Sequence, residues 1–262
     1  VSHPSSPAAR IRRHAGLLAW LGLAACSVSE SVETPTVQTA SLTANPDGDL
    51  TATMLGQVVN RYAPLTVPAG AGDTAVSVLN VSTLNLVPDD LVLIIQMQGA
   101  QIRATDDDQY GTVQSLQGAG LYELVRVRSV DVAGSRVLLD TRCGGLRNAY
   151  SVTGRSQVVR VPQVGNVNIP SGTSVVAQAW DGTKGGVVAL RASGSITVDG
   201  AIDVSGQGFR GGAGQTGLSI SVDESPDRVG YRTTLSTLGA AKGESIAGGV
   251  ADYAANGGAF GR

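Results

Sequence analysis

The sequence predicts an all-β protein, with a compact β-subdomain followed by a right-handed parallel β-helix-like segment. Three observations predict this class. Apolar residues gather in short runs closed by turn residues, and no stretch within residues 55–161 shows the 3.6-residue period of an amphipathic helix. Glycine supplies 35 of the 262 residues, against a usual share of about 7 %. Only two Trp, six Tyr and two Phe are present, so Val, Ile, Leu, Ala and Thr carry the apolar content, which suits β-structure.

Residues 50–165 are predicted to form the β-subdomain. Residues 74–81 (TAVSVLNV) and 121–130 (LYELVRVRSV) alternate apolar and polar side chains with period two, as half-buried strands do. Residues 91–97 (LVLIIQM) form a continuous apolar run, which predicts a strand buried on both faces. The run QVVRV at 157–161 is expected to be a further strand.

Residues 166–210 are predicted to form the β-helix-like segment. Strand-sized pieces recur there about every 8 to 12 residues and are closed by Gly, Asp-Gly or Ser-Gly. In the phrase GSITVDGAIDVSGQG, the side chains of Ile196, Val198, Ile202 and Val204 are expected to point one way, with glycine at the corners. A stack of short strands with aliphatic ladders inside is typical of a parallel β-helix, and its core needs few aromatic residues.

A β-sandwich joined by tight hairpins is the alternative, because Asp199-Gly200 is also a hairpin-turn dipeptide. We favour the solenoid. One solenoid coil cannot bury its apolar side alone, so further coils or a capping domain must cover it, and the β-subdomain could be that cap. Residues 211–262 are expected to be a glycine-rich region, truncated at its end, which would make the chain the N-terminal piece of a longer protein.

The N-terminus predicts export and lipid anchoring. A basic stretch at 10–14 precedes an apolar run at 15–25, which is too short to span the roughly 30 Å hydrocarbon core but fits a cleavable signal. The run ends in LAAC, which resembles the lipobox of bacterial lipoproteins and implies that Cys26 carries the lipid. Residues 1–25 are therefore the predicted signal peptide, and 26–49 a flexible tether rich in Ser and Thr.

The predicted location is the outer membrane or cell surface, because Ser27 follows the cysteine where aspartate would direct inner-membrane retention. An ordinary secretory signal with an incidental cysteine, or a buried apolar helix, is the alternative. The expected partners are the membrane, through the lipid anchor, and a cell-surface polysaccharide or protein. A formal net charge of −2 and only 15 % charged residues argue against nucleic acid.

The acidic run Asp106, Asp107 and Asp108 is a candidate Ca²⁺ site, but it lacks the spacing of an EF-hand loop, and a solvated loop is favoured. Calcium is the only cofactor with a candidate site. His3 and His14 lie in the predicted signal peptide, so the mature chain has no histidine for a serine-hydrolase triad.

Asp199, Asp203 and Trp180 form a candidate carbohydrate site. Paired carboxylates on a β-helix face can cleave a glycosidic bond by acid and base catalysis, with an aromatic ring to stack on the sugar. The alternative is structural, with Asp199 stabilising the turn at Gly200 and Asp203 capping a bend. Neither carboxylate is predicted to be catalytic.

The order of several phrases is similar to that in large glycine-rich surface proteins of gliding and predatory bacteria, the adventurous gliding motility proteins. The resemblance covers about residues 55–250. It is carried by VVNRYA from Val58, LVLIIQMQGAQI from Leu91, DQYG from Asp108, YELVRV from Tyr122, CGGLRNAY from Cys143, QVVRVPQ from Gln157, AWDGTKGGVVAL from Ala179, GFRGG from Gly208 and KGESIAG from Lys242.

The resemblance implies surface display and a part in motility or adhesion, and it supplies no catalytic residue. The sequence therefore predicts a non-enzymatic, lipid-anchored surface protein that acts as a scaffold or as an adhesion or motility module. A β-helical polysaccharide-active enzyme, a lyase or hydrolase, is the alternative. An enzyme would place two or three carboxylates in one exposed groove with sugar-stacking aromatic rings nearby.

Overall fold

The structure is a computed structural model that describes residues 47–105, 109–140, 144–212, 231–232, 240–241 and 243–249. The chain divides into two compact units, residues 1–38 and 39–262, and every described residue belongs to the second. The predicted signal peptide, the lipid-accepting Cys26 and the acidic run Asp106–Asp108 lie outside the described residues, as does most of the predicted glycine-rich region. Those predictions stay predictions.

The all-β prediction is confirmed. The described residues contain β-strands and one 3-10 helix, η1 (Val81–Leu84), and none of their helices is long and apolar enough to cross a membrane. The strands are β1 (Leu50–Thr51), β2 (Gln57–Val58), β3 (Arg61–Pro64), β4 (Ala75–Ser77), β5 (Leu91–Gln96), β6 (Gln101–Ile102), β7 (Val113–Ser115), β8 (Tyr122–Asp131), β9 (Arg136–Asp140), β10 (Ser156–Val161), β11 (Gln163–Val164), β12 (Val167–Ile169), β13 (Ser174–Val176), β14 (Arg191–Ala192), β15 (Ile196–Val198), β16 (Ala201–Ile202), β17 (Tyr231–Arg232) and β18 (Ala240–Ala241).

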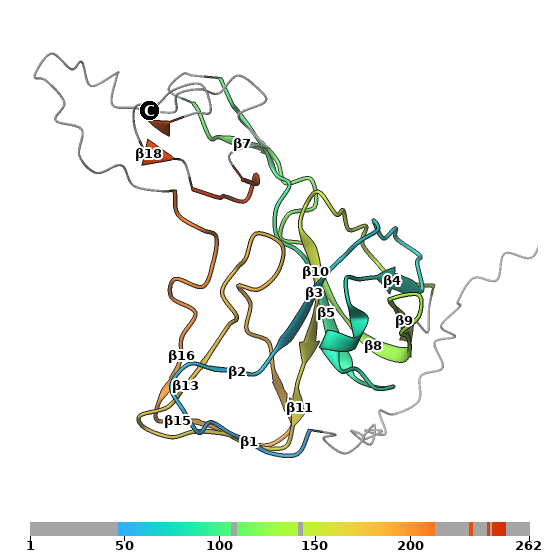
Figure 1. Ribbon diagram of the computed structural model, residues 1–262, viewed down its shortest axis with the longest axis vertical. Helices are drawn as coiled ribbons and strands as arrows, with labels where there is room; N and C mark the ends of the chain where they lie inside the picture. Colours follow the sequence, from blue (N-terminus) through green and yellow to red (C-terminus); the bar gives the residue numbers. More distant parts are fainter. Residues whose placement is uncertain are drawn as a thin grey trace, which may run out of the picture. The chain divides into compact units, whose positions relative to one another are not determined.

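Six strands form the sheet of the β-subdomain, in the order β3-β10-β5-β8-β9-β4 (Figure 1). Every neighbouring pair in this sheet is antiparallel. The central strand β5 is buried on both faces, as its continuous apolar run predicts. Val92 and Ile94 enter one core cluster, and Leu91 and Leu93 enter another on the opposite face.

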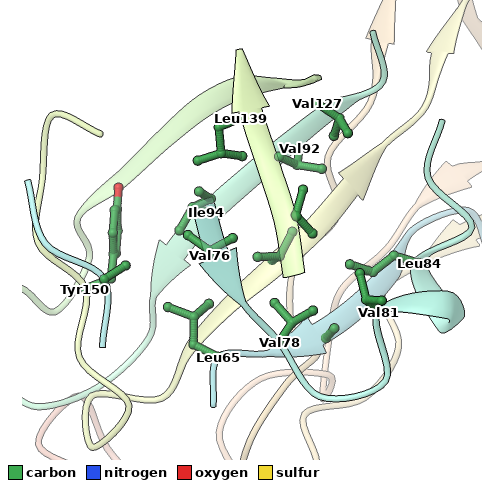
Figure 2. Close-up of a cluster of buried hydrophobic side chains, with 14 of the residues drawn as sticks. Leu65, Val76, Val78, Val81, Leu84, Val92, Ile94, Val127, Leu139 and Tyr150 are labelled. Carbon is green, nitrogen blue, oxygen red and sulfur yellow. The ribbon is translucent and has the colours of Figure 1, made fainter. Parts of the chain in front are cut away.

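The first of these clusters lies within the β-subdomain (Figure 2). Figure 2 shows Val76 from β4, Val92 and Ile94 from β5 and Leu139 from β9 packed together, with Tyr150 at the edge of the cluster. The cluster is almost entirely aliphatic, as expected for a chain with few aromatic residues. Tyr150 is fully buried, and its hydroxyl donates a hydrogen bond to the Glu123 carboxylate over 3.0 Å.

The β-helix-like segment is a stack of short strands that pair only in parallel (Figure 1). Its three small sheets run β1-β12-β15, β2-β13-β16 and β11-β14. Each sheet takes at most one strand from each turn of the chain. We call the strands of one turn a rung, and the described part of the segment has three rungs. The first rung holds β1 and β2, the second β11, β12 and β13, and the third β14, β15 and β16. Tight hairpins would give antiparallel pairs, so the sandwich alternative is wrong for this segment.

The first rung comes from residues that the sequence places in the β-subdomain. Leu50 pairs with Val167, and Val58 pairs with Val176, so β1 and β2 belong to the solenoid. The β-subdomain is thus an insertion between the first and second rungs. Strands of two residues whose partners lie more than a hundred positions away leave no local pattern, which is why the sequence does not reveal this arrangement.

The subdomain and the solenoid share a core and an ion triad. Tyr62 of β3 packs with strands β5 and β10 and with Val187 and Ala189, which lie between the second and third rungs. The Tyr62 hydroxyl donates to the Val187 carbonyl over 2.6 Å. Arg160 of β10 bridges Asp90, which precedes β5, and Asp47, which precedes β1, at 3.0 and 2.6 Å.

Candidate functional site

The two aspartates of the predicted carbohydrate site lie in the third rung and have structural contacts. The Asp199 backbone N–H donates to the Ile169 carbonyl at the corner between β15 and β16. The Asp203 carboxylate accepts a 2.8 Å hydrogen bond from the Ser205 N–H. Hydrogen bonds from the Ser205 hydroxyl and N–H hold the pKa of Asp203 below its ordinary value. The Asp203 contact fits the bend role of the structural alternative, whereas the Asp199 contact involves only its backbone, so the carbohydrate site stays a prediction.

Trp180 is not an open stacking surface in this structure. Its side chain is buried, and the ring meets Phe209 edge to face, with centroids 5.7 Å apart. Its indole N–H donates a 2.9 Å hydrogen bond to Oε2 of Glu244. A sugar-stacking ring needs an exposed face, so the predicted role of Trp180 as a sugar platform is not supported by its position. The ring instead belongs to a polar cluster centred on Glu244.

Glu244 is the centre of that cluster. Oε2 accepts hydrogen bonds from the Trp180 indole, from the Arg210 backbone N–H at 3.1 Å and from Arg210 Nε at 3.1 Å. Oε1 accepts from Arg210 Nη2 in an ion pair. The Arg210 hydrogen bonds hold the pKa of Glu244 below its ordinary value. The Glu244 side chain is 13 % exposed and that of Arg210 57 %, so the carboxylate is enclosed while the cation stays at the surface.

The backbone around Glu244 is held as firmly as its carboxylate. The Glu244 N–H donates to the Arg210 carbonyl over 2.8 Å, and Gln98 Nε2 donates to the Ser245 carbonyl over 2.9 Å. The N–H groups of Gly99 and Ala100 both donate to the Ile246 carbonyl. We call the binding groups of Gln98, Gly99, Ala100, Trp180 and Arg210 the cradle, and residues 243–249 the bound segment.

Two glycines lie close to Arg210. A Cβ on Gly182 would lie 2.4 Å from the Arg210 guanidinium, and its φ of +100° also favours glycine. A Cβ on Gly243 would lie 3.0 Å from the Arg210 carbonyl oxygen and 3.1 Å from the Gly212 nitrogen. The loop 181–184 is itself closed by Asp181, whose Oδ1 accepts from the N–H groups of Thr183 and Lys184.

Sequence reasoning did not single out Glu244 or Arg210 as site residues. They lie in the phrases KGESIAG and GFRGG, and Trp180 lies in AWDGTKGGVVAL, three of the phrases that carry the family resemblance. The structure brings these three phrases together. The family resemblance of these phrases was the only sign in the sequence of a shared site, because Trp180 and Glu244 are 64 positions apart and form no local motif.

A second feature is the exposed aliphatic ladder of the third rung. In the second rung Val167, Ile169 and Val175 are 0–1 % exposed. Their ladder partners in the third rung are, in order, Ile196, Val198 and Ile202, and these are 44–54 % exposed. With Val204 and the chain at 186–190, two of these partners, Ile196 and Ile202, line an apolar groove of about 610 Å³. We call Ile196, Val198, Ile202 and Val204 the open ladder.

The described residues offer no obvious metal centre. Among them, no group of three or more His, Cys, Asp or Glu side chains is placed to hold a metal ion. The candidate calcium run Asp106–Asp108 lies outside the described part, so that prediction is not tested.

Comparisons with solved structures find a weak likeness between part of the chain and phage tailspikes. No family model matches the chain, and no curated protein matches it. The tailspike gp61 of Pseudomonas phage phi297 is 16 % identical over 49 % of this chain and 23 % of its own, with a TM-score of 0.28. The Gp54 tailspike of Acinetobacter baumannii bacteriophage AP22, solved in complex with a capsular saccharide, is 14 % identical over 59 % and 27 %, with a TM-score of 0.29.

The tailspike gp49 of Pseudomonas phage LKA1 is 14 % identical over 49 % of this chain and 22 % of its own, with a TM-score of 0.25. The chain therefore spans about a quarter of the length of the tailspikes it matches. Scores this low bear on neither the site residues nor their chemistry.

Proposed function

We propose that this chain is a non-enzymatic, lipid-anchored scaffold module of the bacterial cell surface, whose solenoid can accept a further rung on the open ladder. The observation that supports this proposal is the difference in exposure between paired side chains of the second and third rungs. Side chains that are buried in the second rung have half-exposed partners in the third, at the same register. Within the described residues, the third rung therefore has the inward side chains of a solenoid without a rung above them.

The occupant that fits the open ladder is one more parallel rung with aliphatic side chains two residues apart. Within the described residues, β15 and β16 pair only with β12 and β13, so one edge of each strand has no strand partner. Parallel addition would continue the pairing that already joins the rungs. A second globular protein is a poorer fit, because a stable interface uses roughly 20–30 residues on each side.

Tandem duplication of the third rung tests this proposal. In the natural chain, Ile202→Asp places a charge on an exposed position and is expected to change stability little. In a chain with residues 191–212 duplicated, the same substitution would bury an unpaired charge and is expected to cost several kcal/mol. Thermal melts of the four chains give the comparison. Thr197→Asp in both backgrounds is the control, because Thr197 is exposed and alternates along β15 with Ile196 and Val198. An equal, small effect of Ile202→Asp in both backgrounds would show that no rung stacks there.

Anchoring and surface location are separate parts of the proposal. Intact-mass analysis of membranes from a Gram-negative host, with Cys26→Ala as the matched variant, tests them. We expect the natural chain to lose residues 1–25 and gain acyl mass, and the variant to leave the membrane fraction. Protease treatment of whole cells then distinguishes display on the outer surface from an inward-facing anchor. Cleavage without acyl mass would make the protein secreted instead of anchored.

A motility or adhesion role, with a surface polysaccharide or protein as partner, is the finer part of the proposal. It is supported by the phrases shared with the gliding motility proteins, three of which meet at the cradle. The polysaccharide-active enzyme remains the competing function. The structural hydrogen bonds of Asp203 and the buried position of Trp180 favour the scaffold.

A further inference from the structure

The bound segment is recognised through a very short stretch of chain. Gly243 allows close approach to the backbone at 210–212, and the Glu244 carboxylate is bound by Trp180 and Arg210. The carbonyl groups of Ser245 and Ile246 accept the remaining hydrogen bonds from the cradle. Four consecutive residues, Gly-Glu-Ser-Ile, thus make every contact named here.

These contacts have the character of peptide recognition. Main-chain hydrogen bonds from the cradle to a peptide backbone provide affinity, and a side-chain pocket provides specificity. Here the pocket is a carboxylate site with an indole donor and an arginine fork, and charge-assisted bonds to arginine are the stronger kind. A neutral side chain at position 244 would leave the Arg210 guanidinium without its carboxylate partner.

We propose that the cradle is a recognition site for a Gly-Glu-Ser-Ile strand, and that the cradle of one molecule also binds the bound segment of a second copy. An exchanged segment repeats each contact with the same atoms, which makes exchange of an identical element a low-cost route to association. The partner is therefore another molecule of this chain. Such exchange would link neighbouring molecules on a surface, and it does not depend on the stacking of solenoid rungs.

Two complementary variants of the full-length chain test the exchange. Glu244→Ala removes the carboxylate but keeps the cradle. Trp180→Phe with Arg210→Ala removes the side-chain donors of the cradle's carboxylate site but keeps the bound segment, and we call this chain cradle-deficient. Each variant alone is expected to be monomeric in analytical ultracentrifugation, and a mixture is expected to form a 1:1 complex. The matched control adds Glu244→Gln to the cradle-deficient chain, and this mixture is expected to stay monomeric. A monomeric test mixture overturns the second-copy partner.

A peptide with the sequence of residues 242–249, KGESIAGG, tests recognition separately. It is expected to bind the Glu244→Ala chain about 10- to 100-fold more tightly than the same peptide carrying Glu244→Gln, as for the loss of a charged hydrogen bond. Fluorescence anisotropy of the labelled peptides gives both affinities. Equal binding of the two peptides, or no binding of either, overturns the recognition site. If Glu244→Ala does not fold, Glu244→Gln, which keeps the side-chain size, replaces it as host.

Discussion

The β-subdomain and the solenoid finish their cores in different ways. In the subdomain, β5 is covered on both faces by residues of the described chain, with Val92 and Ile94 fully buried on one side. In the solenoid, the second rung is equally well buried, but the open ladder of the third rung is not. The same aliphatic residue types therefore complete one core and leave the other open at one end.

The difference follows from how each architecture buries apolar surface. Strand β5 is covered on both faces, although its neighbour β8 leaves Tyr122 and Leu124 more than half exposed. Each solenoid rung, by contrast, depends on a neighbour above and below. The inserted subdomain is joined to the first rung through Asp47, and to the chain between the second and third rungs through the packing of Tyr62 against Val187 and Ala189.

The largest predicted effect breaks the joint between the two regions. Arg160→Ala would leave the carboxylates of Asp90 and Asp47 without their cation, and the Asp90 side chain is 2 % exposed. Removing one member of a buried ion cluster costs about 3–5 kcal/mol. Urea titration followed by circular dichroism measures the loss.

Arg136→Ala is the matched control for this prediction. It removes an arginine whose ion pair with Asp131 is exposed, and it is expected to change the free energy of unfolding little. Equal losses for the two variants would mean that the triad does not join the subdomain to the first rung.

The second prediction compares the same substitution in two rungs. Ile169→Ala removes a fully buried side chain from the second rung and is expected to cost about 2–4 kcal/mol. Ile196→Ala removes a half-exposed side chain from the third rung and is expected to cost less than about 1 kcal/mol. Thermal melts of both variants give the difference. Comparable costs would indicate that the open ladder is already covered in the natural chain.

The sequence predicts the repeating parts of this molecule well and its long-range contacts poorly. The alternation of Ile196 and Val198 predicts that both point to the same side of β15, and in the structure they pair with the buried Val167 and Ile169 of the second rung. Their exposure depends on whether another rung is present, which no local pattern reports. β1 and β2 carry too few residues for a pattern at all.

The candidate site shows the same limit. An aromatic residue in a glycine-rich loop is a reasonable sugar platform on sequence grounds, and only the tertiary contacts show Trp180 buried against Phe209 and Glu244. The carboxylate at 244 has no catalytic or metal-binding spacing to mark it. Only the tertiary fold brings the Glu244 carboxylate to Arg210, because the two residues are 34 positions apart in the sequence.

The third prediction concerns the pH dependence of the cradle. The pKa of Glu244 is lowered in the folded chain, chiefly by Arg210, so its contribution to stability is complete above the ordinary value of 4.5. That contribution is lost as pH falls from there through the lowered pKa. Glu244→Gln is expected to remove this dependence and to cost about 1–2 kcal/mol at neutral pH, a value reduced by the exposure of Arg210.

Tryptophan fluorescence measures the third prediction directly. A Trp20→Phe background leaves Trp180 as the only tryptophan, because the chain has two. Release of Glu244 is expected to expose the indole and shift its emission to longer wavelength below pH 4.5. Glu123→Gln, in the same background, is the control because Glu123 binds Tyr150 in the subdomain. A shift that survives Glu244→Gln would assign the transition to another group.

The smallest predicted effect is that of Asp203→Asn, and it separates the scaffold from the enzyme. The asparagine oxygen can still accept the hydrogen bond from the Ser205 N–H, so the bend after β16 should keep its shape, and the melting temperature should not change measurably. A catalytic carboxylate behaves differently, because its amide cannot transfer a proton and turnover is lost while the fold is kept. Reducing-end release from purified surface polysaccharide, for the natural chain and for Asp199→Asn and Asp203→Asn, is the decisive measurement. Release by the natural chain that either substitution abolishes would make the third rung a catalytic face. In the scaffold, all three chains release nothing, and the Asp203 carboxylate serves only to hold the bend after β16.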